Sequence, residues 1–180
     1  MALADCNRTL AATSEEGLDP AALPATGANL LPDPPAGMEV EEKRREDIFT
    51  VPCDVLVPAA VENAVSERIA QHLAVRAVVP GANLAVTEAA DTLLHERDIV
   101  VVPDFLAGCG GSLSMEGLFA PDEHPAPEEV LAHVEKRMVG LVGRILARSR
   151  EEGVSPTVAA RRACAEIVPQ PGTRPYGRPH

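Results

Sequence analysis

Three short apolar runs stand out in the first two thirds of the chain: residues 54–58 (DVLVP), 75–80 (VRAVVP) and 99–104 (IVVVPD). Each run is rich in β-branched residues, nearly continuous rather than alternating, and contains a proline at or near its end. Continuous apolar runs are typical of strands in parallel sheets, where both faces are buried. We therefore predict that the three runs are adjacent parallel strands of one sheet. Residues 1–5 (MALAD) are a candidate fourth, very short strand.

Helix start signals alternate with these runs. The pair Asp19-Pro20 predicts an N-cap and the first residue of a short helix through Leu23. Ser66 and Thr87 are the predicted N-caps of helices that follow the first and second runs. Strands and helices that alternate in this way are typical of βαβ units, so we predict an α/β fold.

The remaining segments predict a helical end and two loops. Apolar residues recur at helical spacing from Pro127, and Gly153 suits the end of that long helix. Ser155 and Pro156 then begin a last helix through about Ile167. Residues 27–45 predict loop with at most one edge strand, and residues 168–180 a disordered tail. We see no internal repeat and expect one domain over residues 1–167.

Composition narrows the class of protein. Of 180 residues, 46% are hydrophobic, but there is no Trp, one Tyr and three Phe, so Ala, Val, Leu and Ile must build the core. A formal net charge of -11 argues against binding to nucleic acid or to an anionic membrane surface. No apolar run reaches the ~18 residues of a membrane span, and the first ten residues do not have the pattern of a signal peptide. We expect a cytoplasmic protein.

No metal site or nucleophile is predicted. The chain has no CxxC, HxxxH or HExxH pattern that would indicate a metal site. Its four cysteines are Cys6, Cys53, Cys109 and Cys164. Cys109 follows the third apolar run, but no base is identifiable near it in sequence. We assign no catalytic residue.

Candidate chemistry lies at the strand ends, because open parallel sheets bind ligands beyond the carboxyl ends of their strands. Asp5 ends the first candidate strand, and an acid there can accept both hydroxyls of an adenine ribose; it can equally be an exposed loop residue. Ala59 and Ala60 let backbone approach a flat cofactor, or simply allow tight packing. Gly81 and Asn83 permit close approach and an amide contact, or simply form a turn. Residues 103–112 predict a Gly-rich loop against a ligand, or only a bend.

Taken in order, these segments resemble the C-terminal NAD(P)-binding domain of the glutamate/leucine/phenylalanine/valine dehydrogenase family. The matching segments are residues 2–23, 53–65 and 78–119 and the long helix after Pro127. The resemblance implies a Rossmann-like, mostly parallel sheet flanked by helices. It also implies NAD as cofactor, with NADP possible, oxidative deamination of an L-amino acid to a 2-oxo acid, and either a homo-oligomer or a partner of a dehydrogenase subunit.

The resemblance also implies residue roles. Asp5 would hold the adenine ribose, which favours NAD, although Arg8 nearby could accommodate the phosphate of NADP. Ala59, Ala60, Gly81 and Asn83 would line the cofactor, with Asn83 near the nicotinamide. Residues 108–112 would close the nicotinamide and substrate side.

Two departures from the family matter. Its substrate domain, with catalytic Lys and Asp, and its first cofactor-domain strand and Gly-rich turn would all precede Met1, so we expect a partial dinucleotide-binding domain that is inactive by itself. The alternative is a non-catalytic remnant that acts as an interaction or regulatory module. The family also often has EGAN at residues 80–83, here PGAN, and usually NAGG at residues 108–111, here GCGG. The asparagine of that second motif is therefore replaced by Gly108.

Overall fold

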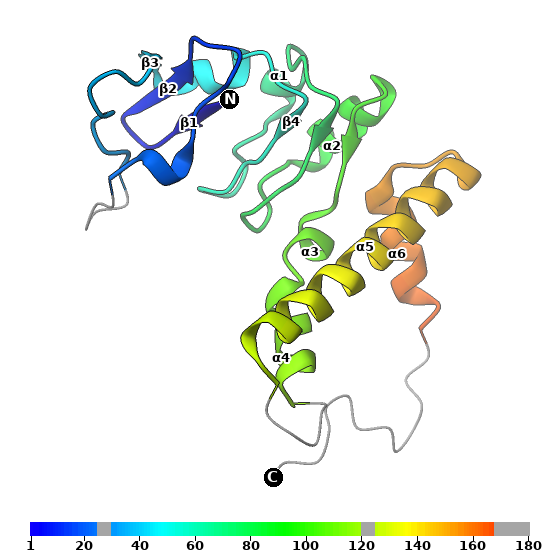
Figure 1. Ribbon diagram of the computed structural model, residues 1–180. Helices are drawn as coiled ribbons and strands as arrows, with labels where there is room; N and C mark the ends of the chain where they lie inside the picture. The colour runs from blue at the N-terminus through cyan, green and yellow to red at the C-terminus, as the bar shows by residue number, and fades with distance from the viewer. Residues whose placement is uncertain (25–29, 120–124, 168–180) are drawn as a thin grey trace.

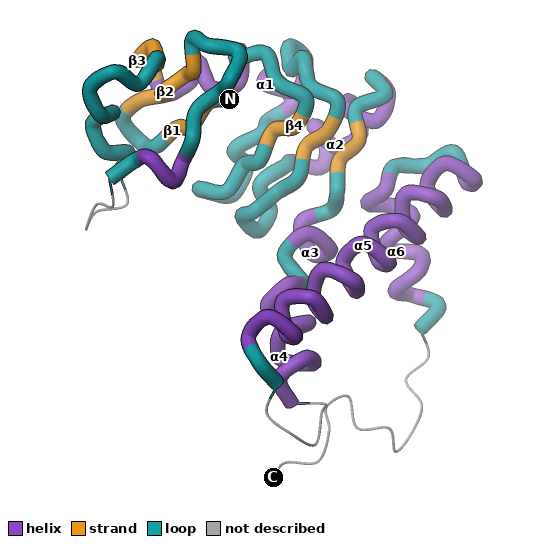
Figure 2. The backbone as a smooth tube through the Cα atoms, viewed as in Figure 1, coloured by secondary structure: helices purple, strands orange, loops and turns teal. Residues whose placement is uncertain are grey.

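The computed structural model describes residues 1–24, 30–119 and 125–167, which form two three-stranded sheets and a group of helices (Figures 1 and 2). The predicted disordered tail, residues 168–180, lies outside the described residues. One sheet is antiparallel and comes first in the chain; the other is parallel. The described part of the chain is thus a mixed α/β fold.

The parallel sheet contains the three predicted strands. They are β4 (Val55–Leu56), β5 (Ala77–Val78) and β6 (Val100–Val101), in the order β4-β5-β6. Both neighbouring pairs are parallel, with Val55 opposite Ala77 and Ala77 opposite Val100. The prediction of three adjacent parallel strands is confirmed.

Helices cover one face of this sheet. Helices α1 (Glu67–Ala70) and α2 (Glu88–Glu96) pack on the face that carries Leu56, Val78 and Val101. The buried core they form with the sheet consists of Leu56, Val65, Ala70, Leu73, Val78, Ala90, Leu94, Ile99 and Val101. On β4, the residues that alternate with Leu56 are not covered: Val55 is 49% and Val57 59% exposed. The burial of both faces that continuous apolar runs imply is therefore incomplete at β4.

The antiparallel sheet corrects the expectation of one mostly parallel sheet. Its strands are β1 (Ala2–Ala4), β2 (Arg8–Ala12) and β3 (Val40–Arg44), in that order. The candidate strand at residues 1–5 does exist, but it forms a hairpin with β2, with Leu3 opposite Leu10. The physical reason is the short connection through residues 5–7, which suits a hairpin but not the crossover that parallel strands need. Strand β3 is the edge strand expected within residues 27–45.

Several helix ends follow the predicted capping signals. The Asp19 side chain accepts the N–H of Ala21 at 2.9 Å and begins a 3₁₀ helix, η1 (Pro20–Ala22). Thr87 caps α2 by accepting the N–H of Ala90 at 3.2 Å. Ser66 occupies the N-cap position of α1 without a side-chain hydrogen bond. A second 3₁₀ helix, η2 (Arg45–Thr50), follows β3.

The helical end of the chain contains the two predicted helices and two more. Helix α5 (Pro127–Glu152) ends at Gly153, whose φ of +63° is left-handed, and Ser155 caps α6 (Pro156–Ala165). The Gly-rich loop expected at residues 103–112 is instead mostly helical. Helix α3 (Asp104–Ala107) is followed, after Gly108 and Cys109, by α4 (Gly110–Phe119). Figure 1 shows α4, α5 and α6 gathered beyond the β6 side of the parallel sheet. Among the described residues, no helix is long and apolar enough to span a membrane.

Asp91 connects this helical end to the parallel sheet. Its carboxylate, on α2, accepts the hydroxyl of Ser155 at 3.0 Å and that of Thr157 at 2.9 Å, at the start of α6. Asp91→Ala is expected to lower the free energy of unfolding by about 2–3 kcal/mol, because two part-buried, charge-assisted hydrogen bonds are lost.

Urea denaturation would measure this loss, and hydrogen exchange of the α6 amides would locate it. Glu88→Ala is the matched control, since it removes an acid from the same first turn of α2 without breaking these bonds. An Asp91→Ala variant as stable as Glu88→Ala would contradict this account of how α6 is held.

Candidate functional site at the carboxyl ends of the parallel strands

The loops after β4 and β5 have the same form. Each leaves its strand at a proline and reaches a residue of left-handed φ, Asn63 at +55° and Leu84 at +53°. Each then enters its helix through a similar tetrapeptide, Ala-Val-Ser-Glu at 64–67 and Ala-Val-Thr-Glu at 85–88. The two segments run side by side, with a parallel bridge between Val65 and Val86. This short repeat was readable in the sequence, and our sequence analysis missed it.

Gly81 lets the ends of β4 and β5 come together. The N–H groups of Gly81 and Ala82 donate to the carbonyl of Pro58 at 3.0 and 3.1 Å. A Cβ on Gly81 would lie only 2.9 Å from the Cβ of Ala59. Glycine is therefore required here for close approach. Four of the five predicted site residues lie together at the carboxyl ends of the strands, and all four are exposed: Ala59, Ala60, Gly81 and Asn83.

A chain of hydrogen bonds adds the end of β6 to this group. The N–H of Asn63 donates to the carbonyl of Leu84 at 2.7 Å, and the N–H of Leu84 donates to the Asp104 carboxylate at 2.7 Å. We call Asn63, Leu84 and Asp104 the three-loop link. A left-handed φ costs a leucine roughly 1–2 kcal/mol. The two hydrogen bonds stabilise Leu84 in this conformation. Asn83 extends toward Gly108, where an added Cβ would lie 4.0 Å from its Oδ1.

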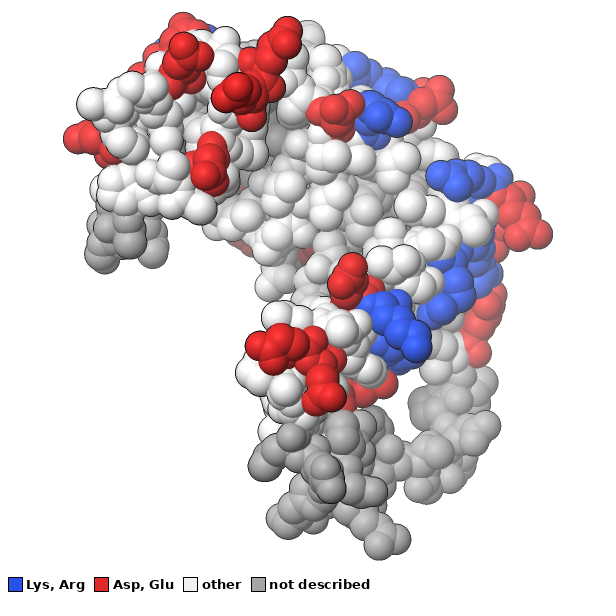
Figure 3. Space-filling view, viewed as in Figure 1, with Lys and Arg blue, Asp and Glu red and all other residues white. Residues whose placement is uncertain are grey.

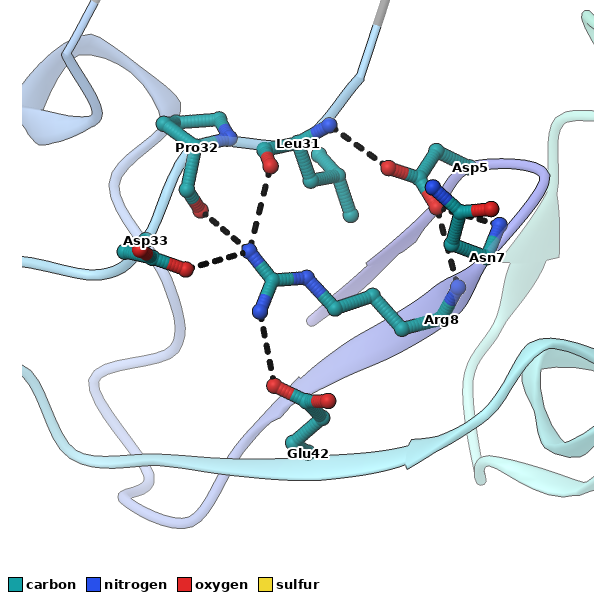
Figure 4. Close-up of polar contacts among 7 residues, drawn as sticks. All are labelled: Asp5, Asn7, Arg8, Leu31, Pro32, Asp33 and Glu42. Atoms are coloured by element: carbon teal, nitrogen blue, oxygen red, sulfur yellow. Dashed lines mark hydrogen bonds and ion pairs between the residues drawn. The ribbon is translucent and has the colours of Figure 1, made fainter.

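Asp5 lies elsewhere, in the turn between β1 and β2 (Figure 4). Its Oδ1 accepts the N–H groups of Asn7 at 2.7 Å and Arg8 at 2.9 Å, and its Oδ2 accepts the N–H of Leu31 at 2.7 Å. These hydrogen bonds, the one from Leu31 first, hold the pKa of Asp5 below its ordinary value. Since an ionised carboxylate has about four acceptor sites, roughly one remains for a ligand.

Arg8 is committed to the same region (Figure 4). Its guanidinium donates to the carbonyls of Leu31 and Pro32 at 3.1 and 3.0 Å. It also pairs with Asp33 at 2.9 Å and Glu42 at 2.7 Å. Asp5 and Arg8 thus fasten residues 31–33 to the hairpin, and a phosphate at Arg8 would have to compete with two carboxylates.

The contacts of Asp5 predict a pH-dependent effect. Because its pKa is lowered on folding, the charged carboxylate stabilises the fold above the ordinary Asp pKa of ~3.9, and this contribution is lost as pH falls through the lower folded value. Asp5→Asn should therefore be less stable than wild type at pH 7, with the difference shrinking below about pH 4.

Thermal unfolding followed between pH 2 and 8 would test this expectation. Asp33→Asn is the control, because its carboxylate belongs to the same cluster but its side chain is 94% exposed and should contribute little. A constant difference between Asp5→Asn and wild type across the pH range would show that the ionised carboxylate is not what stabilises the turn.

Among the described residues, no three His, Cys, Asp or Glu side chains gather in a way that could hold a metal ion. Cys109 is half-buried, with its Sγ 3.3 Å from the Sδ of Met138 on α5. The polar groups of the loops at the strand ends are thus exposed backbone, the side-chain amides of Asn63 and Asn83, and the carboxylates of Glu62 and Asp104. Such a surface is suited to binding a flat, polar-edged molecule.

Comparisons with known proteins agree on one family. The profile of the family described as Glutamate/Leucine/Phenylalanine/Valine dehydrogenase matches residues 11–170. The cryptic catabolic NAD-specific glutamate dehydrogenase of Bacillus subtilis is 31% identical over 118 residues, covering 64% of this chain and 28% of that protein. The NADP-specific glutamate dehydrogenase of Saccharolobus shibatae is 41% identical over 73 residues, covering 41% of this chain and 17% of that protein.

A solved structure extends the likeness to the fold. The hetero-hexameric glutamate dehydrogenase from Thermus thermophilus superposes with a TM-score of 0.66 at 26% identity and covers 94% of this chain. The chain spans 42% of the length of that structure and a smaller share of the two curated relatives. Since the family profile matches nearly all of the described residues, this chain belongs to the glutamate/leucine/phenylalanine/valine dehydrogenase family.

Proposed function

We propose that this chain is part of the nicotinamide-cofactor domain of an amino-acid dehydrogenase and binds the cofactor at the carboxyl ends of β4, β5 and β6. The observation that carries the proposal is that three loops meet at the carboxyl ends of the strands. The hydrogen bonds of the three-loop link and the close approach of Gly81 to Ala59 hold these loops together. In open parallel sheets, ligands bind at these carboxyl ends. The relatives include both NAD-specific and NADP-specific enzymes.

The residues present fit such a cofactor. Ala59, Ala60 and Gly81 offer exposed backbone with little side chain, so a flat group can lie against them. The Asn83 amide has both a donor and an acceptor, which matches the carboxamide of nicotinamide. When bound, the nicotinamide supplies the hydride acceptor for oxidation of an L-amino acid to a 2-oxo acid and ammonia. The part of this chain is to bind and orient that group.

We further propose that Asp5 accepts a hydroxyl of the adenine ribose and that NAD is preferred to NADP. The Asp5 carboxylate, whose pKa lies below the ordinary Asp value, is ionised at neutral pH and would repel a 2′-phosphate. The positive charge of Arg8 is already balanced by Asp33 and Glu42. With about one acceptor site free, Asp5 would make one ribose contact without giving up its own turn.

Titration with NADH and NADPH, followed by NADH fluorescence and by calorimetry, tests this proposal. We expect saturable binding that is weak, with NADH bound more tightly than NADPH. Binding of AMP but not of reduced nicotinamide mononucleotide would remove the nicotinamide from these strand ends. The absence of saturable NADH binding at millimolar concentrations would contradict the proposal as a whole.

A second candidate is a module that associates with a dehydrogenase subunit. It is favoured by the uncovered face at β4, an edge strand of the parallel sheet, where Val55 of the strand and Val57 just after it are exposed. Figure 3 shows a mostly uncharged surface over the parallel strands, with acidic side chains gathered over the antiparallel sheet. Uncovered apolar faces and open sheet edges are places where proteins associate. Sedimentation with a full-length dehydrogenase of the family would test this candidate.

A further inference from the structure

Leu84 combines backbone strain with solvent exposure. Among the described residues, three other than glycine have a left-handed φ: Asn63, Leu84 and Asp98. Asn and Asp tolerate this conformation, whereas a leucine there is uncommon. Packing of the Leu84 side chain into the core does not offset this strain, because the residue is 63% exposed. An exposed leucine at this position thus destabilises the fold, and burial of its side chain does not offset that cost.

The preceding loop provides an internal comparison. Asn63 occupies the same place in that loop, with a φ of +55° against +53° for Leu84, three residues before the Ser or Thr that precedes each helix. The loop conformation therefore does not call for leucine, and a residue type suited to it stands in the neighbouring copy. Residues with strained backbone that their surroundings hold in place cluster at functional sites. The Leu84 side chain is therefore a candidate for a functional role.

The surroundings of Leu84 hold it firmly at the sheet edge. Its N–H donates to the Asp104 carboxylate and its carbonyl accepts from Asn63, so both peptide groups of the turn are fixed. Asn83, whose amide is exposed, directly precedes it. An apolar side chain next to an amide matches an aromatic ring with a carboxamide substituent, because the ring needs an apolar contact and the carboxamide needs a donor and an acceptor.

We propose that Leu84 is a binding residue whose side chain packs against the face of the nicotinamide ring. The three-loop link serves to present it, and Asp104 acts as a positioning residue that holds the strained turn. This inference rests on the proposed function, which places the cofactor at these strand ends. It goes further in assigning the nicotinamide, and not the adenine, to Leu84.

Methyl NMR of the 180-residue chain with labelled leucines tests the assignment, since it detects even millimolar binding. The probes are NADH, reduced nicotinamide mononucleotide and AMP. We expect the Leu84 methyl resonances to shift with NADH and with the mononucleotide, and to stay unchanged with AMP. If NADH shifts the amides of Gly81 and Asn83 but leaves the Leu84 methyls in place, the inference fails while the proposed function stands. If NADH shifts none of them, both fail.

Variants separate the side chain from the strain. Leu84→Gly should bind NADH roughly fivefold to tenfold more weakly, because the apolar contact is lost. Its thermal unfolding midpoint should be unchanged or higher, because glycine adopts a left-handed φ freely. Leu84→Met keeps an apolar side chain and should stay within about twofold of wild type. Asp98→Gly is the matched control, because Asp98 also has a left-handed φ, +58°, but precedes β6 at the opposite end of the sheet; it should leave NADH affinity unchanged. A Leu84→Gly variant that binds NADH as wild type does would overturn the inference.

Discussion

Gly81→Ala is expected to lower the free energy of unfolding by about 1–3 kcal/mol and to weaken NADH binding strongly. The added methyl carbon would lie 2.9 Å from the Cβ and 3.4 Å from the Cα of Ala59. Neither atom is the end of a flexible side chain, so the loops after β4 and β5 must separate. That movement would strain the hydrogen bonds from residues 81 and 82 to Pro58 and displace the backbone against which the cofactor is proposed to lie.

Urea denaturation and NADH titration of the same variant measure both effects. Gly143→Ala is the matched control, because a Cβ at Gly143 meets nothing within 4 Å and the position lies inside α5. There the added methyl should be neutral or stabilise by up to ~1 kcal/mol through helix propensity. If Gly81→Ala is as stable as wild type and binds NADH equally well, the close approach of the two loops has no functional meaning.

The 180-residue polypeptide by itself is expected to show no sustained oxidation of amino acids. Holding a substrate against a cofactor accounts for roughly 7–11 kcal/mol of barrier lowering, and a positioned base adds about 10²–10⁴-fold. The described loops at the strand ends offer the side-chain amides of Asn63 and Asn83 and two carboxylates, the exposed Glu62 and Asp104, which already accepts the N–H of Leu84. Neither of the two lysines belongs to these loops: Lys43 pairs with Glu41 on β3, and Lys136 is exposed on α5.

NADH absorbance followed with a panel of L-amino acids measures this expectation. The panel should include glutamate, leucine, phenylalanine and valine, with a mock preparation as the blank and a full-length glutamate dehydrogenase as the positive control. Turnover that rises in proportion to the purified chain and is absent from the blank would show that these residues carry their own catalytic groups.

The parallel sheet could be predicted because the sequence signals for its strands and helices lie within short segments. The runs around Val55, Val78 and Val101 are short and apolar, and a proline follows each one. Thr87 and Ser155 cap the helices they precede. The antiparallel sheet was missed because β1 was considered without its partner. The three residues between β1 and β2 were the available signal, since they leave room only for a hairpin.

The helix at residues 110–119 was missed for a different reason. Gly110 and Gly111 have poor helix propensity, so the sequence predicted a loop. Packing on α5 overrides that propensity: Leu113 is buried, and Gly117 has no side chain, which lets His133 and Val130 approach closely. Contacts of this kind depend on residues well separated along the chain, and local patterns do not contain them.

The candidate site divides along the same line. Ala59, Ala60, Gly81 and Asn83 follow directly from the strand ends, and the structure brings them to one edge. The contacts of Asp5 and Arg8 do not, because their partners lie far along the chain. Leu31 is 26 residues from Asp5, and Glu42 is 34 residues from Arg8. The position of Asp5 in the sequence therefore suggested only a ligand-binding role. The structure shows that its carboxylate stabilises the turn between β1 and β2.

The measurement that tests the central claim most directly is an amide chemical-shift map of the labelled 180-residue chain titrated with NADH. The account predicts that the largest shifts fall on the three loops at the carboxyl ends of the parallel strands, at residues 58–61, 81–84 and 103–108, with Asp5 shifting as well. Shifts confined to the β2–β3 part of the antiparallel sheet, or to α5 and α6, would contradict it.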